Sequence, residues 1–206
     1  MEIPFMYAAA GLAALNAPKA AITAVHLVKD IGSTNDFATI TGALSIANDA
    51  VTAGDMTIQT IDNVDTLVIA GKNDLTKTGQ SDKHHTGNAT AGSATSITEA
   101  GQAWGINSFI RKVALIKSGT GSGQSAKVVS NTADTLTFAA DAFATPPDAT
   151  SVFELYDDLA IVYTDGTQII HAVDESTDKA VSAAVEDTVS IGAHNIPAPL
   201  VQNKVV

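Results

Sequence analysis

Short runs of β-branched and apolar residues, separated by turn residues, recur along most of the chain. In the run 55–61, Met56 and Ile58 alternate with Thr57, Gln59 and Ile61, which is the period of a β-strand. Asp165-Gly166 between two β-rich runs is typical of a tight hairpin. The same pattern predicts strands over 22–28, 37–46, 55–61, 66–70, 106–116, 126–130, 135–139, 151–156, 159–164 and 167–173, with weaker alternation over 180–185 and 188–191.

Three segments depart from this pattern. Residues 1–20 are rich in Ala and Leu, which predicts an arm with a short helix over 7–15, ended at Asn16-Ala17-Pro18. Residues 75–98 are polar with almost no large apolar side chains, so we expect a mobile loop or an interaction loop. Residues 196–206 contain two prolines without clear periodicity and are predicted to form an extended C-terminal arm.

These elements predict an all-β fold. Strands at a spacing of about 8–12 residues with turn chemistry between them are typical of an antiparallel β-sandwich or barrel, here with extended N- and C-terminal arms and a short N-terminal helix. The β-rich domain covers 21–195, with 21–74 and 99–195 as possible sub-parts joined by the polar loop. No apolar run is long enough to span a membrane, and the acidic Glu2 is unlike the basic start of a secretion signal.

Charge narrows the classes of function. The chain of 206 residues holds 11 Lys and Arg against 22 Asp and Glu, a formal charge of -11. This balance argues against a nucleic-acid partner, because phosphate contacts require clustered basic residues. There is no cysteine, which excludes disulfides, thiolate metal sites and a cysteine nucleophile.

The sequence offers no assembled catalytic, cofactor or metal motif. The Gly-rich run 118–124 lacks the Gly-Lys-Ser/Thr of a phosphate-binding loop and is predicted to be a hairpin turn. His84 and His85 are adjacent, so on a strand they point to opposite faces and make a poor metal pair. No nucleophile elbow is present. The paired acids, expected to be solvated, are Asp157-Asp158, Asp174-Glu175 and Glu186-Asp187.

Apolar residues of the two arms and the single tryptophan are the candidate contact residues. Trp104 follows a polar segment and could stack on a sugar, although a lone tryptophan more commonly anchors a core or an interface. The interface candidates are Phe5, Met6, Tyr7, Leu12, Leu15, Trp104, Pro197, Pro199 and Leu200.

One segment carries a family resemblance. Residues 98–156 contain a tryptophan after a polar stretch, a Gly-rich turn, a Thr-Leu-Thr strand and a Pro-Asp-x-Thr-Ser ending. The matching residues are Ala103-Trp104, Lys117 to Gln124, Asn131-Thr132, Asp134 to Phe138 and Pro147 to Leu155. This segment resembles a module of tailed-bacteriophage virion proteins. It departs from that pattern at Ala126-Lys127, where an arginine is usual, and at Phe143, where a second tryptophan is common.

The resemblance implies a non-enzymatic virion structural protein. The leading expectation is a capsid decoration, or cement, protein that binds the lattice of the major capsid protein on the capsid surface as a homotrimer, without a cofactor, nucleic acid or membrane. The alternative is a tail, baseplate or head-fibre protein that binds a receptor or a glycan. An enzyme is the least expected class, because no acid–base or nucleophile arrangement is present.

Overall fold

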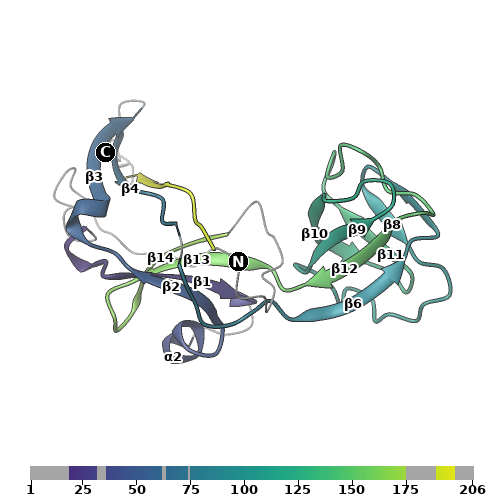
Figure 1. Cartoon of the computed structure of the whole chain (residues 1–206), viewed down its shortest axis with the longest axis horizontal. Coiled ribbons are helices and arrows are strands. Elements are labelled where there is room, and N and C mark those ends of the chain that lie inside the picture. Colours follow the sequence, from purple (N-terminus) through teal and green to yellow (C-terminus); the bar gives the residue numbers. More distant parts are fainter. Residues whose placement is uncertain (1–18, 32–35, 62–63, 74, 175–188, 198–206) are drawn as a thin grey trace, which may run out of the picture. The chain divides into compact units, whose positions relative to one another are not determined.

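The computed structural model describes residues 19–31, 36–61, 64–73, 75–174 and 189–197 (Figure 1). Contacts divide the chain into two compact units. Within the described residues, unit 1 comprises everything up to Gly79 together with 160–174 and 189–197, and unit 2 comprises 80–159. These boundaries differ from the sub-parts 21–74 and 99–195, because the chain returns to unit 1 after Leu159.

Unit 1 contains two antiparallel sheets. The five-stranded sheet has the order β14-β13-β1-β2-β5, and the three-stranded sheet has the order β15-β4-β3. The strands are β1 (Ala24–Lys29), β2 (Ser45–Ala50), β3 (Met56–Ile61), β4 (Val64–Ile69), β5 (Thr76–Lys77), β13 (Leu159–Thr164), β14 (Ile169–Asp174) and β15 (His194–Pro197). Every residue of β13 is buried, which matches its place between β14 and β1 and its largely apolar sequence.

Unit 2 is built on one antiparallel sheet with the order β6-β12-β9-β10-β11-β8-β7. Its strands are β6 (Lys83–Asn88), β7 (Ala91–Ser93), β8 (Ser96–Thr98), β9 (Val113–Ser118), β10 (Ser125–Asn131), β11 (Thr135–Phe138) and β12 (Val152–Tyr156).

The two outermost strands of the unit 2 sheet, β6 and β7, follow one another on the chain. Between them, the amide of Ala89 donates a hydrogen bond of 2.9 Å to Ser151 O, and the amide of Thr90 donates one of 2.7 Å to Thr98 O. Residues 89 and 90 therefore lead directly from the β12 side of the sheet to the β8 side. The all-β prediction is confirmed, and its finer form, a sandwich or a barrel, stays a prediction.

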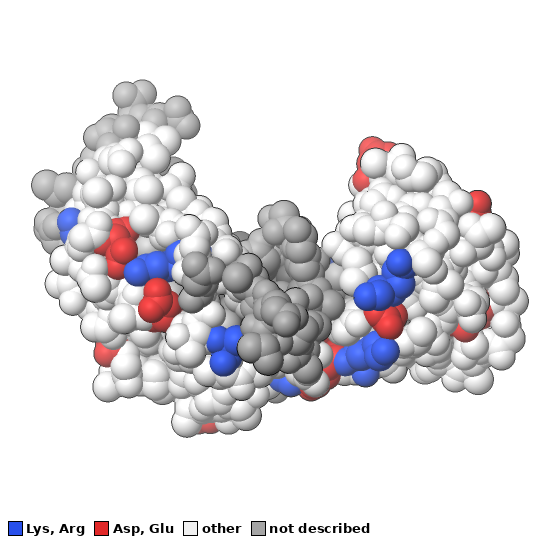
Figure 2. All heavy atoms as spheres, in the orientation of Figure 1, with Lys and Arg blue, Asp and Glu red and all other residues white. Residues whose placement is uncertain are grey.

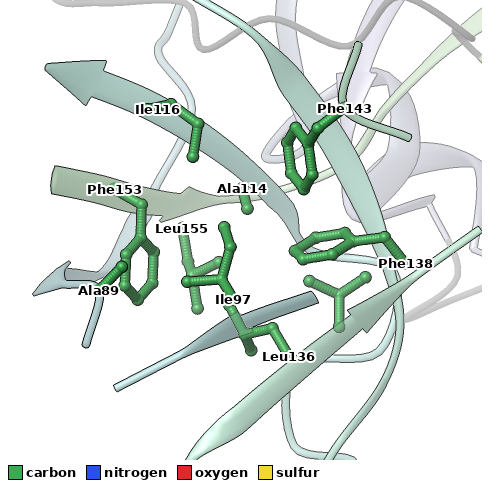
Figure 3. Close-up of a cluster of buried hydrophobic side chains, with 10 residues drawn as sticks. Ala89, Ile97, Ala114, Ile116, Leu136, Phe138, Phe143, Phe153 and Leu155 are labelled. Carbon is green, nitrogen blue, oxygen red and sulfur yellow. The ribbon is translucent and has the colours of Figure 1, made fainter. Parts of the chain in front are cut away.

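The core of unit 2 is a contiguous apolar cluster (Figure 3). Alternate residues of β9, β11 and β12 point into it, as Phe153 and Leu155 of β12 do. Phe138 and Phe143 meet edge to face with ring centroids 4.9 Å apart. The buried members are Ala89, Ile97, Ala114, Ile116, Val128, Leu136, Phe138, Phe143, Phe153 and Leu155.

The predicted strand over 37–46 is wrong in its first half, which forms a helix, α2 (Phe37–Thr41). Asp36 caps this helix, because its carboxylate accepts a hydrogen bond of 2.8 Å from the amide of Thr39. Ile40 is buried against Val28 and Val162. The cap at Asp36 and the burial of Ile40 account for this turn of helix. The residue composition of the segment does not indicate either of them.

The polar segment 75–98 is not a loop, because it forms the strands β5, β6, β7 and β8. The core-facing positions of β6 are His85 and Gly87, which pair with Leu155 and Phe153 of β12. The apolar side chains over this stretch are therefore supplied mainly by the neighbouring strands. A strand with such small or polar inward residues has no apolar alternation for a sequence pattern to detect.

The predicted helix over 7–15 and all of the predicted N-terminal arm before Lys19 lie outside the described residues, as does most of the predicted C-terminal arm. Pro197 is described, and it pairs with Thr66 of β4 at the end of β15. Within the ranges given above, no helix is long and apolar enough to cross a membrane.

Candidate functional site

The segment 104–112 of unit 2, which we call the anchored loop, is fixed to strand β10 by one buried asparagine. The side chain of Asn131 accepts a 2.9 Å bond from the amide of Phe109 and donates a 2.8 Å bond to Gly105 O. In return, Asn107 Oδ1 accepts from the amide of Asn131, and Asn107 N donates to Asn131 O. Asn131 is only 2% exposed. These bonds replace the strand pairing that the run 106–116 predicts before Val113.

Three backbone irregularities meet at this loop. Asn107 and Arg111 adopt positive φ angles of 59° and 72°, which are uncommon for residues other than glycine. Opposite them, the register of β10 with β11 shifts between Val128 and Ser130, which leaves Val129 as the extra residue of a bulge. Such irregularities cost free energy and persist only where surrounding contacts enforce them.

The result is an exposed apolar surface, the aliphatic patch, which consists of Ile106, Ile110 and Val129. Their exposed fractions are 79%, 43% and 56%, and they are the large hydrophobic residues that are exposed among the described residues. Backbone hydrogen bonds bring the segments that carry them together, because the amide of Arg111, next to Ile110, donates to Val128 O, and the amide of Asn107, next to Ile106, donates to Asn131 O. Apolar surface gathered on a fixed loop is typical of an interaction site.

Two aromatic residues of the anchored loop, Trp104 and Phe109, pack against the core of unit 2. Trp104 meets Phe109 edge to face with centroids 5.4 Å apart, and it meets His85 in the same way at 5.3 Å. His85 Nε2 lies 2.7 Å from Glu99 Oε2 and packs near Phe153 at 5.7 Å. Trp104 is half-buried against the core of unit 2, so its indole serves as an anchor, one of the two roles that the sequence predicts for it.

Asp157 and Asp158 lie beside the loop and are buried, which corrects their prediction as solvated acids. Asp157 is 4% exposed, and its Oδ1 lies 2.9 Å from Lys112 Nζ and 2.6 Å from His84 Nε2. Arg111 donates from Nε and Nη2 to Asp158 Oδ2 at 3.0 and 2.7 Å. Carboxylates this deeply buried require such partners.

The electrostatics of Asp157 follow from these contacts. Burial raises the pKa of its carboxyl group, but the hydrogen bonds from Lys112 and His84 and the charge of Lys112 outweigh burial. The pKa of Asp157 therefore lies below its usual value of 3.8, and the group is ionised at neutral pH. The arrangement is an ion-pair network that fixes the end of β12.

A second charged group lies on β12. Glu154 Oε1 lies 3.1 Å from Lys83 Nζ, and Glu154 Oε2 lies 3.6 Å from Lys117 Nζ. The hydroxyl of Tyr156 donates a hydrogen bond of 2.6 Å to Glu154 Oε2. Burial and this carboxylate raise the pKa of Tyr156 to about 12. In the part of Figure 2 that carries β6 and β12, blue and red atoms adjoin within a mostly white surface, so charges are paired there and do not form a patch of one sign.

The described residues contain no group of three metal-ligating side chains. The predicted turn over 118–124 is confirmed between β9 and β10, with positive φ at Gly119, Gly121 and Gly123. At Gly119 a side chain would collide with the backbone of Thr150, which explains the need for glycine there.

The structure describes only two of the predicted interface residues. Trp104 supports the aliphatic patch, and Pro197 lies in β15 of unit 1. The remaining candidates, Phe5, Met6, Tyr7, Leu12, Leu15, Pro199 and Leu200, lie outside the described residues.

The sequence analysis missed the aliphatic patch, although one signal could have found it. In the run 106–116, large apolar residues stand at 106, 109, 110, 113, 115 and 116, a spacing that does not keep the period of a strand before 113.

No protein-family model, curated protein or solved structure matches the chain.

Proposed function

We propose that the chain is a non-enzymatic structural protein of a tailed-bacteriophage virion, and specifically a capsid decoration protein that binds the lattice of the major capsid protein. The proposal starts from the resemblance of residues 98–156 to a module of such virion proteins. This segment supplies most of unit 2 and contains both the anchored loop and the aliphatic patch.

The observation that carries the proposal is the aliphatic patch on a loop whose shape is fixed before binding. Holding Ile106 and Val129 in water is unfavourable, and the strained backbone of Asn107 and Arg111 adds to that cost. A surface of this kind is stabilised when another protein chain covers it. Because the loop is already ordered by Asn131, binding loses little conformational entropy.

The neighbourhood of the patch also favours contact over catalysis. Oδ1 of Asp157 contacts Lys112 and His84, and Oδ2 of Asp158 accepts hydrogen bonds from Arg111, so both acids take part in holding the structure together. Trp104 meets its neighbouring rings edge to face, so it acts as a support for the loop. A glycan-binding role would use such a ring as a flat stacking platform, which makes the tail or fibre alternative the second choice.

The test is binding of the purified chain to capsid shells assembled from the major capsid protein encoded in the same genome. We expect the chain to sediment with the shells and to add density at the junctions of the lattice in cryo-electron microscopy images. Density confined to the tail tip of whole particles would favour the alternative instead. Absence of the chain from both shells and tails would overturn the proposal.

A further inference from the structure

Strand β3 of unit 1 turns one side of its backbone to the outside of its sheet. It is an end strand, and its register with β4 is continuous, without a bulge (Figure 1). Because the amide of Ala70 donates to Asp55 O, the odd-numbered residues of β3 turn their N–H and C=O groups towards β4. The even-numbered residues, Met56, Ile58 and Thr60, therefore turn theirs to the outer edge.

Two of these three residues offer a complete set of backbone groups. The amide of Met56 already donates to Ala53 O in the short helix before the strand. Ile58 and Thr60 keep both N–H and C=O on the outer edge, and no strand of the described ranges lies beside them. Backbone groups in this position are a template for one further strand.

The other strands that end a sheet carry the features that prevent such pairing. β5, β7 and β15 have two, three and four residues, and β15 ends at Pro197. β6 begins at Lys83 and has a register shift, and β14 ends at Asp174 and also has a register shift. Short strands, charges, prolines and bulges all discourage edge pairing. β3, with the sequence Met-Thr-Ile-Gln-Thr-Ile, has none of these features.

The sequence of β3 suits a second copy of itself. In a chain with a formal charge of -11, a charged edge that pairs with its own copy brings like charges together, whereas β3 carries no charge. An antiparallel pair that sets Ile58 opposite Thr60 of the other copy satisfies both outward groups of both residues. We propose that β3 of one copy pairs with β3 of a second copy in this register, with the two-fold axis at Gln59.

This pairing continues the two faces of the sheet across the axis. Met56, Leu67 and Ile69 lie on the buried face, at 2%, 0% and 0% exposure, and Thr57 and Gln59 lie on the exposed face. The register pairs even-numbered residues with even-numbered residues, so buried-face residues meet buried-face residues. The two three-stranded sheets become one continuous sheet. Such a contact uses the same surface on both copies, so it closes as a dimer.

A single introduced cysteine tests the register, because the chain has no cysteine of its own. Gln59 faces its own copy at a non-hydrogen-bonded position, where Cα atoms lie about 4.5 Å apart, and a disulfide spans about 4.4–6.8 Å. Gln59→Cys is therefore expected to form a disulfide-linked dimer under mild oxidation, seen by electrophoresis without reductant. Thr57→Cys is the matched control on the same exposed face, because its two copies would lie about 14 Å apart.

A charge exchange tests the same contact without oxidation. Gln59→Lys and Gln59→Glu each place two like charges opposite one another, so each variant alone is expected to associate about fivefold more weakly than the unmodified chain. An equimolar mixture of the two variants should recover the association. Thr57→Lys adds the same charge away from the axis and should associate as the unmodified chain does. Sedimentation equilibrium gives the mass in solution, and thermal melting checks that each variant is folded.

Three results would overturn this inference: a monomeric unmodified chain at every concentration, equal cross-linking of Gln59→Cys and Thr57→Cys, or association that Gln59→Lys leaves unchanged. If residues 1–18 or another undescribed segment of the same chain occupied the edge of β3, the first result would follow. A trimer that does not cross-link at position 59 would also overturn it. The experiment contains no capsid, so its failure leaves the proposed decoration function standing, and failure to bind shells leaves the β3 pair standing.

Discussion

The two units stabilise buried polar groups with different kinds of partner. Unit 2 buries carboxylates and pairs them with cations, as Asp157 does with Lys112. Unit 1 instead surrounds a buried polar group with rings. The hydroxyl of Tyr163 lies 2.9 Å from His194 Nδ1, and the ring of His171 stacks on Tyr163 with centroids 6.4 Å apart. The Tyr163–His194 contact joins β13 of one sheet to β15 of the other.

The difference makes the two units lose stability to acid over different pH ranges. Burial lowers the pKa of His171, and the nearby His194 lowers it further. Burial also lowers the pKa of His26, which lies 3.0 Å from the hydroxyl of Ser45. Unit 1 therefore contains partly buried imidazoles, those of His26 and His171, that favour the neutral form, whereas unit 2 contains a buried carboxylate, that of Asp157, that favours the ionised form. Short strands of similar composition thus produce two interiors that fail at different pH.

The largest expected effect tests whether each unit is held by its own core. Phe153→Ala removes a fully buried ring from unit 2 and should cost about 3–5 kcal/mol of its unfolding free energy. Ile40→Ala, a buried residue of unit 1, should cost about 2–5 kcal/mol in that unit. Trp104 is the only tryptophan, so urea unfolding followed by its fluorescence reports on unit 2.

We expect Phe153→Ala to lower the midpoint of the Trp104 transition strongly and Ile40→Ala to leave it in place. Phe153→Leu, which keeps most of the apolar volume, should fall between Phe153→Ala and the unmodified chain. Equal shifts from the substitutions in the two units would mean that they unfold as one, and the comparison would not hold.

A medium effect is expected from the ion pairs of unit 2. Asp157→Asn keeps the shape of the side chain but leaves the charge of Lys112 without its carboxylate. Loss of one partner of a buried pair costs several kcal/mol, and partial exposure of His84 reduces this to about 1–3 kcal/mol. Asp141→Asn is the matched control, because Asp141 is exposed and asparagine also tolerates its positive φ.

The same substitution makes the pH response of unit 2 testable. Because the folded-state pKa of Asp157 is lowered, its stabilisation is complete above 3.8 and is lost as the pH falls through the folded value. The difference in urea midpoint between Asp157→Asn and the unmodified chain should therefore shrink below pH 3.8. A difference that stays constant into strong acid would show that the pair contributes no charge-dependent stability.

The smallest effect concerns unit 1. Because the folded-state pKa of His171 is lowered, its contribution is complete above 6.5 and declines as the pH falls from 6.5 towards the folded value. Hydrogen exchange of the β13 amides, corrected for the intrinsic rate, should show weaker protection over this range, while β12 stays protected. His171→Phe should make the response of β13 shallower, and an unchanged slope would assign it to other groups.

The sequence predicted the elements whose own residues carry the pattern. β3 alternates apolar and polar residues, β13 is continuously apolar, and the turns at 118–124 and 165–166 contain glycines with positive φ. In these places local propensity and tertiary packing agree, so the all-β class follows directly from the chain.

The sequence failed where a neighbour supplies what the segment lacks. β6 has a histidine and a glycine at inward positions, and it becomes a strand because Phe153 and Leu155 of β12 cover the same core. α2 depends on the cap of Asp36, and the end of β12 depends on cations from Arg111 and Lys112, far away along the chain.

The sequence by itself therefore determined the β-rich class, the positions of the turns, the low share of charged residues and the absence of a catalytic motif. Only the tertiary structure decided which acids are buried, how the polar segment 75–98 pairs, and that Ile106, Ile110 and Val129 are exposed. The physical reason is that a turn or an alternating strand is specified by residues close in sequence. A buried charge or a fixed loop is specified by partners such as Asn131 that only folding brings within reach.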